Sequence, residues 1–97
     1  MNEVARDFWQ RALDAFRVAQ TIICLSPDSA ASRAYYAAFY AVSAHFALAG
    51  RTFRKHSAVE AAVHRDLVKA GHWPAELGQG YTRLLNVRSI GDYGGSQ

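Results

Sequence analysis

The feature that most constrains the fold is a run of seventeen residues, 34–50, that carries no formal charge. The run reads AYYAAFYAVSAHFALAG, with large aromatic side chains set among small alanines. A helix that is apolar on nearly every side has to be covered on most of its circumference. A membrane-spanning helix needs about twenty mainly apolar residues, and three tyrosines, a serine and a histidine interrupt this run. We therefore predict a central, buried helix over residues 28–49.

The residues around this central helix mark its two ends. Ser26 suits an N-cap, because its side-chain oxygen can accept from a free backbone N–H, and Pro27 suits the first helical position. Gly50 is typical of a helix C-terminus. Before the central helix, residues 3–25 repeat apolar side chains every three or four positions, which predicts an amphipathic helix. Its expected apolar stripe consists of Val4, Phe8, Ala12, Phe16, Ala19 and Ile23.

The rest of the chain predicts two further helices. One begins at Ser57, whose spacing to Glu60 is that of a capping box, and ends at Gly71. The other begins at Pro74, and no stretch shows the period-two alternation of a strand. The 97 residues contain no linker and no internal repeat. We therefore predict a single all-α domain over residues 1–97, an antiparallel up-and-down bundle of about four helices.

Positive charge is confined to one part of the chain. Eleven Lys and Arg residues exceed eight Asp and Glu residues, which gives a net charge of +3. Residues 1–50 and 73–97 are each neutral, so the whole excess lies in residues 51–72. Such a patch can attract phosphate groups, although a solvated connection between helices explains it equally well. The candidate contacts to a nucleic acid or a partner are Arg51, Arg54, Lys55, His56, Arg65 and Lys69.

Several classes of site are disfavoured by the residues present. A single cysteine, Cys24, excludes a disulfide framework and fits a reducing compartment. The amino-terminal residues carry charges of both signs and no apolar signal region. His56, His64 and His72 are spaced eight residues apart, which does not align them on a helix. We therefore expect a cytoplasmic protein with no membrane segment, no metal site and no cofactor.

Four motifs follow one another along most of the chain. The first two are SRAYYAAFYAVSA at 32–44 and KHSAV at 55–59. A Val-Lys-Ala-Gly stop and a final Leu-Asn-Val-Arg…Asp-Tyr follow within residues 67–94. In this order they resemble the bacterial and archaeal branch of the HEPN (higher eukaryotes and prokaryotes nucleotide-binding) domain family. The resemblance implies a helical bundle that dimerises, with a role in RNA metabolism, in toxin–antitoxin pairs or beside a minimal nucleotidyltransferase.

The resemblance also implies where an active site would lie. Ribonucleases of the family carry an Arg and, four to six residues later, a His near the last helices, and two such motifs line a cleft between subunits. Here the matching Arg is Arg88, and no His follows it. Asp92 can accept a proton, but an ordinary carboxyl is a poor acid at neutral pH. The candidate catalytic residues are therefore Arg88, Asp92 and Tyr93. The alternative interpretation is a structural polar cluster of Arg33, Tyr36, Arg88 and Asp92.

The same Arg-to-His spacing occurs elsewhere, at Arg51…His56 and at Arg65…His72. Neither pair lies at the family's motif position, and composition alone predicts about 1.4 such matches by chance. His56 is more simply explained as the start of a helix, where its ring can bond across to the central helix.

Three functions therefore remain open. The leading hypothesis is a non-catalytic, homodimeric module that associates with nucleotide or RNA in a nucleotidyltransferase or toxin–antitoxin-type pair. The alternatives are a metal-independent ribonuclease that uses Arg88 and Asp92, and a purely structural scaffold. Relatives usually continue with another amphipathic helix after the Asp-Tyr, so we also expect an apolar groove beside the first helix. Its expected lining is Phe8, Trp9 and Phe16, and a second subunit is its expected cover.

Overall fold

The protein is described here by a computed structural model, which covers residues 2–93 and the side chains as far as Arg88. Its α-helices are α1 (Glu3–Ile22), α2 (Pro27–Leu48), α3 (His56–Ala62) and α4 (Ala75–Tyr93). A π-helical segment, η1 (Val63–Val68), continues directly from α3. Residues 2–93 contain no strand, so the predicted all-α bundle of about four helices is confirmed.

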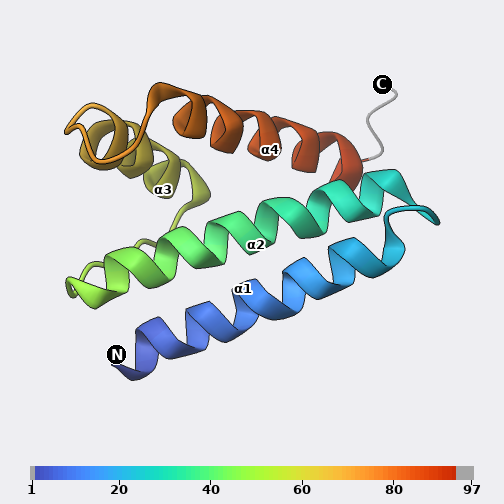
Figure 1. Ribbon diagram of the computed structural model, residues 1–97, viewed down its shortest axis with the longest axis horizontal. Helices are drawn as coiled ribbons and strands as arrows, with labels where there is room; N and C mark the ends of the chain where they lie inside the picture. Colours follow the sequence, from blue (N-terminus) through green and yellow to red (C-terminus); the bar gives the residue numbers. More distant parts are fainter. Residues whose placement is uncertain (1, 94–97) are drawn as a thin grey trace.

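The second helix, α2, lies at the centre of the bundle (Figure 1). α1 runs antiparallel to α2 along one side, and α4 lies along the other side. The segment formed by α3 and η1 packs near the C-terminal end of α2 and the N-terminal end of α4. The predicted central position of the uncharged run is therefore confirmed. Among the described residues, no helix has the length and apolar character needed to cross a membrane.

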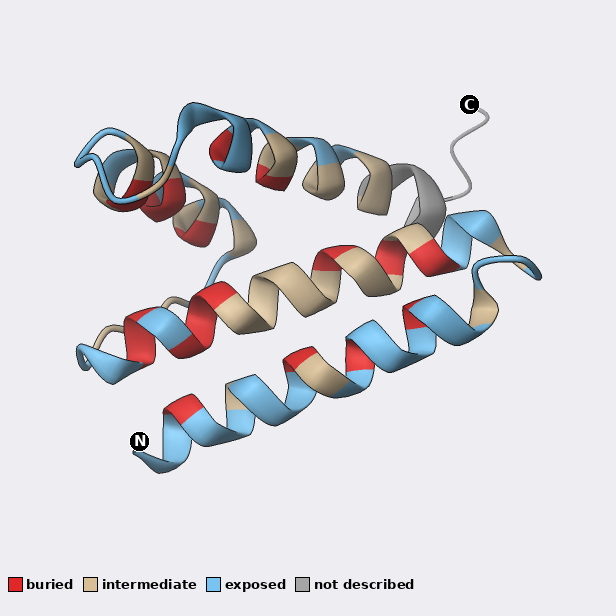
Figure 2. Ribbon diagram, in the orientation of Figure 1, coloured by how far each residue is buried: buried red, intermediate tan, exposed pale blue. Residues whose placement is uncertain are grey.

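The core is built where α2 meets α3, η1 and α4. Tyr35 in α2 and Val59 and Val63 in the following segment are fully buried. Leu67 of η1 and Tyr81 of α4 pack into the same cluster. Buried positions of α2 face both α1 and α4, whereas those of α1 lie along the side toward α2 (Figure 2).

α1 packs on α2 through a row of alanines that shares only Ala12 and Ala19 with its expected stripe. Its buried residues are Ala5, Ala12, Ala15 and Ala19. In contrast, Val4, Phe16 and Ile23 of the predicted stripe are each about half exposed. The distance between two helices depends on the side chains at their contact, so the alanine row gives the closer packing and turns the larger side chains outward. The helix was predicted correctly except that it ends at Ile22, and its buried face was predicted in part, since only Ala12 and Ala19 of the stripe are buried.

The ends of the helices follow the expected signals in most places. Ser26 is the N-cap of α2, where its Oγ accepts from the backbone N–H of Ser29 at 3.4 Å, and Pro27 is the first residue of that helix. Gly50 and Gly71 follow helical segments with φ of +76° and +90°, a conformation that glycine adopts without strain. These three predicted helix ends are therefore confirmed.

The predicted capping box is wrong. α3 begins at His56, so Ser57 lies inside the helix and Lys55 holds the N-cap position without a side-chain bond. The Glu60 carboxylate instead accepts from the Thr82 hydroxyl of α4 at 2.8 Å. A tertiary hydrogen bond has therefore replaced the local one that the spacing suggested.

The π-helical segment keeps one apolar row directed at the core. Val59, Val63 and Leu67 recur at intervals of four residues, and on a regular α-helix such a row would drift by about 40° at each step. In η1 the N–H of Lys69 donates to the carbonyl of His64, five residues earlier, at 2.9 Å. This wider turn reduces the drift, and all three residues of the row are buried.

Gly78 allows α4 to approach η1 closely. A Cβ at this position would lie 2.7 Å from Val68 Cγ2 and 3.1 Å from His64 Nδ1. A Cβ at Gly80, two residues later, would meet nothing within 4 Å. Gly78 and Gly80 therefore differ, since close packing on η1 requires a glycine at 78, whereas Gly80 faces open space.

The substitution Gly78→Ala should lower the free energy of unfolding by about 1–2 kcal/mol. Overpacking costs about 1–3 kcal/mol, and the better helix propensity of Ala offsets up to about 1 kcal/mol. Gly80→Ala is the matched control and should raise stability by up to about 1 kcal/mol in dilute solution. Urea unfolding followed by circular dichroism measures both changes. Equal effects of the two substitutions would contradict the tight contact at Gly78.

Candidate functional site

A buried hydrogen bond joins α2 to the start of α3. Tyr35 is fully buried, and its hydroxyl oxygen lies 2.7 Å from His56 Nδ1. The His56 ring also stacks on Phe39, with 4.2 Å between ring centroids. The bond across to the central helix that the sequence suggested for His56 is therefore present.

Two residues of α4 surround the same tyrosine. The Arg88 guanidinium carbon lies 5.3 Å from the centroid of the Tyr35 ring, within cation–π range. The Tyr81 ring meets the Tyr35 ring edge-on at 5.8 Å. Arg88 therefore contacts the same side chain as His56.

The environment keeps both tyrosines protonated. Burial raises the pKa of the Tyr35 hydroxyl above its ordinary value, although the nearby charge of Arg88 acts in the opposite direction. Burial also raises the pKa of Tyr81 strongly, and the neighbouring Tyr35 adds to that effect. A neutral Tyr35 hydroxyl is assigned as the donor to His56 Nδ1, and a neutral imidazole then carries its own proton on Nε2.

The polar cluster considered from the sequence is brought together in part. The Arg33 guanidinium carbon lies 4.8 Å from the centroid of the Tyr36 ring, and the Tyr36 ring meets that of Tyr35 at 5.3 Å. The guanidinium groups of Arg33 and Arg88 therefore lie over two adjacent tyrosines, Tyr36 and Tyr35. The side chains of Asp92 and Tyr93, the other candidates at the end of α4, lie outside the described residues.

A second polar cluster, which the sequence did not reveal, joins α3, η1 and α4. The Thr82 hydroxyl donates to Glu60 Oε2 at 2.8 Å and lies 2.7 Å from His64 Nε2. Because the single hydroxyl proton is used on Glu60, His64 Nε2–H is assigned as the donor to Thr82. All three side chains are half-buried. Only the spacing of Glu60 and His64 on one helix face could have hinted at a shared partner.

The basic region 51–72 is not a uniform set of free cations. Arg51 donates to Asp66 Oδ2 at 2.8 Å, and Arg65 donates to both oxygens of the same carboxylate at 2.9 and 3.0 Å. These hydrogen bonds, the one from Arg65 first, hold the pKa of the Asp66 carboxyl well below its usual range. Arg51 also lies 4.9 Å from the centroid of the Phe46 ring. Arg51 and Arg65 are therefore both hydrogen-bonded to the carboxylate of Asp66.

Three cations of the region remain open to solvent. Arg54, Lys55 and Lys69 are exposed, and the structure gives them no ion pair among the described side chains. Arg54 and Lys55 are adjacent in the loop before α3, and Lys69 follows η1. These residues are the part of the predicted patch that can meet a phosphate without first breaking an ion pair.

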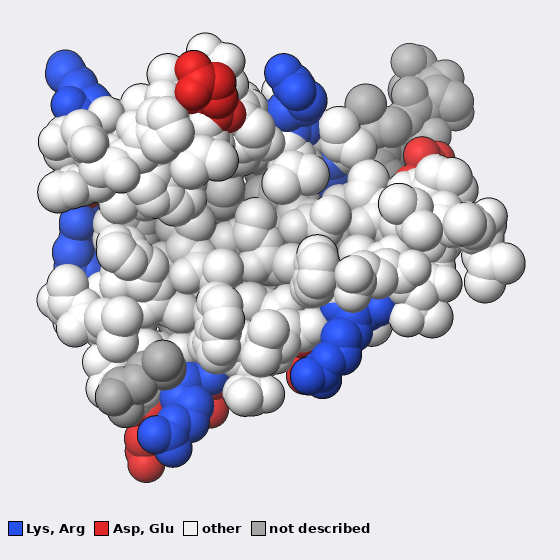
Figure 3. All heavy atoms as spheres, in the orientation of Figure 1, with Lys and Arg blue, Asp and Glu red and all other residues white. Residues whose placement is uncertain are grey.

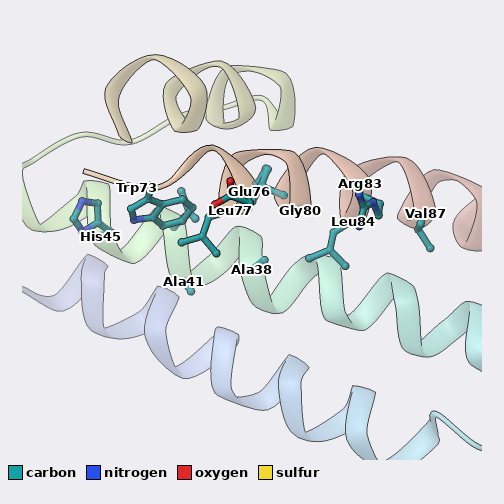
Figure 4. Close-up of a pocket in the computed structure, with 12 residues that line it drawn as sticks. Ala38, Ala41, His45, Trp73, Glu76, Leu77, Gly80, Arg83, Leu84 and Val87 are labelled. Atoms are coloured by element: carbon teal, nitrogen blue, oxygen red, sulfur yellow. The ribbon is translucent and has the colours of Figure 1, made fainter. Parts of the chain in front are cut away.

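An apolar groove lies between α2 and α4. Its volume is about 600 Å³, and its lining includes Ala41, His45, Trp73, Leu77 and Leu84. Figure 3 shows a face whose middle is uncharged and hollowed between α2 and α4, with charged side chains along the edges. In Figure 4 the groove-lining side chains come from α2 on one side and from Trp73 and α4 on the other.

A smaller hollow of about 250 Å³ lies between α1 and α2. Trp9 of α1 and Leu48 of α2 line it, and it shares Ala41 and His45 with the larger groove. Trp9 therefore lies at a groove beside the first helix, as expected, and remains 43% exposed. Phe8 instead stacks against Tyr40 at 6.2 Å, and Phe16 is 53% exposed but is absent from the lining of the hollow.

Comparison with known proteins agrees with the order of helices and motifs. A family model for the HEPN domain matches residues 5–97. The chain belongs to the HEPN domain family. In this HEPN domain, the Arg88 guanidinium lies over the ring of the buried Tyr35.

Two relatives share long segments with this HEPN domain. A UPF0332 protein from Thermotoga maritima is 50% identical over 66 residues, which cover 68% of this chain and 50% of the relative. A UPF0332 protein from Gloeobacter violaceus is 32% identical over 69 residues, which cover 71% of this chain and 55% of the relative. The chain therefore spans about half the length of the curated relatives it matches. No solved structure matches it.

The ion pairs of Asp66 should make stability depend on pH in the acid range. The folded-state pKa of Asp66 lies below its unfolded value, so its contribution is present above about pH 4 and is lost as the pH falls further. The difference in unfolding free energy between the wild type and Asp66→Asn should therefore be constant near neutral pH and shrink below about pH 4. Urea midpoints measured across this range give that difference. A difference that persists unchanged in acid would contradict the two ion pairs.

Proposed function

We propose that this HEPN domain is a non-catalytic, homodimeric module of the cytoplasm that associates with RNA or nucleotide. It acts together with a partner protein, of the minimal nucleotidyltransferase or toxin–antitoxin type. The observations that carry the proposal are three exposed cations of residues 51–72, Arg54, Lys55 and Lys69, which have no ion pair among the described side chains.

The charge distribution supports contact with phosphate. Residues outside 51–72 sum to zero charge, so a polyanion meets a net attraction in one part of the chain. Within that part, the Asp66 carboxylate is shared by two guanidinium groups, that of Arg51, which also lies over the Phe46 ring, and that of the exposed Arg65. Arg54 and Lys55 stand next to each other in a loop, and flexible basic side chains on a loop can follow a phosphate backbone.

The surroundings of Arg88 support a non-catalytic role. Its guanidinium lies over the ring of Tyr35, a fully buried residue. Tyr35 also holds His56 through its hydroxyl. A guanidinium that packs on a core ring stabilises the contact between α2 and α4. This structural role is sufficient to explain an Arg at position 88 without a catalytic role.

Reversing the charge of the exposed pair should weaken RNA binding at least tenfold. The double variant Arg54→Glu/Lys55→Glu removes two cationic contacts, so the slope of log affinity against log salt should become shallower by about 1.4 for single-stranded RNA. Fluorescence anisotropy with a labelled single-stranded RNA at several salt concentrations measures both quantities.

The matched control is Arg6→Glu/Arg17→Glu on α1, which changes the net charge by the same amount at exposed positions outside residues 51–72. The control should bind nearly as the wild type does, and circular dichroism should give equal helicity for all three proteins. Equal loss in both variants would leave only a general charge effect and contradict the patch. Wild-type binding that does not respond to salt would favour the scaffold alternative.

A metal-independent ribonuclease is the second candidate, and one observation favours it. An imidazole and a guanidinium, from His56 and Arg88, meet at the same tyrosine. Imidazole transfers protons near neutral pH, and guanidinium stabilises phosphorane charge. The candidate residues from the sequence, Arg88 and Asp92, lie at the same end of α4.

This candidate predicts that the purified protein cleaves a mixed RNA pool in EDTA and that Arg88→Ala reduces the rate at least about a hundredfold, the typical loss of one charge-stabilising donor. Gel electrophoresis of the RNA over several hours measures the rate, and circular dichroism confirms that the variant is folded. Arg17→Ala, at an exposed position of α1, is the control and should cleave at the wild-type rate. RNA that stays intact with the wild type would exclude the ribonuclease.

A further inference from the structure

Along the groove between α2 and α4, no helix of the described residues covers an apolar face of α4. Leu77, a large apolar side chain on this face, is 51% exposed. The groove residues of α4 include Leu77, Gly80, Leu84 and Val87. Successive members are separated by three, four and three residues, which is the spacing of the seam of a coiled coil. The seam therefore has the pattern of a helix that packs along a second helix.

The middle of this seam is open. A Cβ built on Gly80 would meet nothing within 4 Å, so the surface above it has room for a side chain from outside the chain. Leu77, one turn earlier, projects an apolar side chain of the kind that such a space can take. In Figure 4 Leu77 and Leu84 lie along the groove on either side of Gly80.

Two charged residues of opposite sign also line the groove. Glu76 directly precedes Leu77, and Arg83 directly precedes Leu84. They are seven residues apart and therefore occupy equivalent flanking positions of two successive heptads. In an antiparallel helix pair, equivalent flanking positions of the two helices face each other. A second copy of α4 would therefore place Glu76 beside an Arg83 and Arg83 beside a Glu76.

We propose that α4 packs antiparallel on α4 of a second copy, with this groove as the dimer interface. Leu77 of each copy lies over the partner's Gly80, and Glu76 of each copy pairs with the partner's Arg83. This inference rests on the homodimer of the proposed function and names the surface that forms it. A two-fold axis repeats every contact, so the interface contains two Leu77–Gly80 contacts and two Glu76–Arg83 pairs.

The charge pattern favours a second copy over an unrelated helix. A two-fold interface has to be complementary to itself, and an opposite-charge pair spaced by one heptad meets that condition in the antiparallel orientation. If Glu76 and Arg83, the residues at the rim of the groove, were uncharged or carried charges of the same sign, they would not favour a second copy. The uncharged lining between the rims, with Ala41 of α2 below the seam, supplies apolar surface for the partner's Leu77.

Charge exchange at the rim tests this orientation. Glu76→Arg alone puts two positive side chains opposite each other in both pairs, and Arg83→Glu alone puts two negative ones there. Each single variant should therefore raise the dimer dissociation constant at least about tenfold, because like charges across an interface oppose binding. Sedimentation velocity over a concentration series measures that constant, and circular dichroism verifies that each variant is helical.

Recombination distinguishes this interface from a general loss of stability. Mixing the Glu76→Arg and Arg83→Glu proteins should restore dimers, because one copy then carries two positive and the other two negative side chains at the rim. The double variant Glu76→Arg/Arg83→Glu should restore homodimers for the same reason. Asp14→Arg and Arg17→Glu on α1 change the net charge by equal amounts at exposed positions and should dimerise as the wild type does.

The outcomes separate the inference from the proposed function. A wild-type dimer that is unaffected by either single variant, or variants that fail to recombine, would overturn this interface while the dimer itself stands. A wild-type protein that stays monomeric at its highest soluble concentration would overturn both the dimer and the interface. The RNA-binding result at Arg54 and Lys55 is measured separately and does not depend on either outcome.

Discussion

The hydroxyl of Tyr35 is the polar group on which the arrangement of the helices depends. Tyr35 is fully buried in the central helix, and a buried hydroxyl without a partner costs about 1–3 kcal/mol. His56 provides that partner at 2.7 Å, which fixes the start of α3 against α2. Arg88 and Tyr81 pack on the same ring from α4. One side chain therefore holds three helices together, and any change in its position would shift the basic loop that precedes His56.

Small residues at the helix contacts determine which apolar side chains of α1 and α4 are exposed. Alanines at the contact of α1 and α2 turn Trp9 and Phe16 outward. Gly78 lets α4 approach η1, and the opposite side of α4 is then left along the groove with Leu77 exposed. Close packing on one side of a helix leaves large apolar side chains on another side. The exposed apolar face and the groove are therefore consequences of how α1 and α4 pack, and they are available for a partner.

Sequence patterns with a single interpretation predicted the fold, and patterns with two interpretations did not predict the site. The uncharged run at 34–50 admits only a buried central helix, and Ser26 and Gly50 end that helix through local chemistry. α1 carries apolar side chains on two faces, so the spacing of its apolar residues could not show that the alanines, rather than the larger side chains, face α2. Glu60 fits a capping box and a tertiary acceptor equally well in sequence, and Thr82, 22 residues away, decided between them. The cluster around Tyr35 likewise required the fold to bring His56 and Arg88 to one ring.

The same ring explains how Arg88 is held in the fold. A guanidinium over a tyrosine ring is stabilised by cation–π attraction, and burial keeps the Tyr35 hydroxyl neutral despite that positive charge. A neutral phenol can then donate to His56, which orients the imidazole and the start of α3. Each of these contacts contributes to packing in the ground state and requires no substrate. Arg88 and His56 therefore have a structural role that is sufficient to explain their positions.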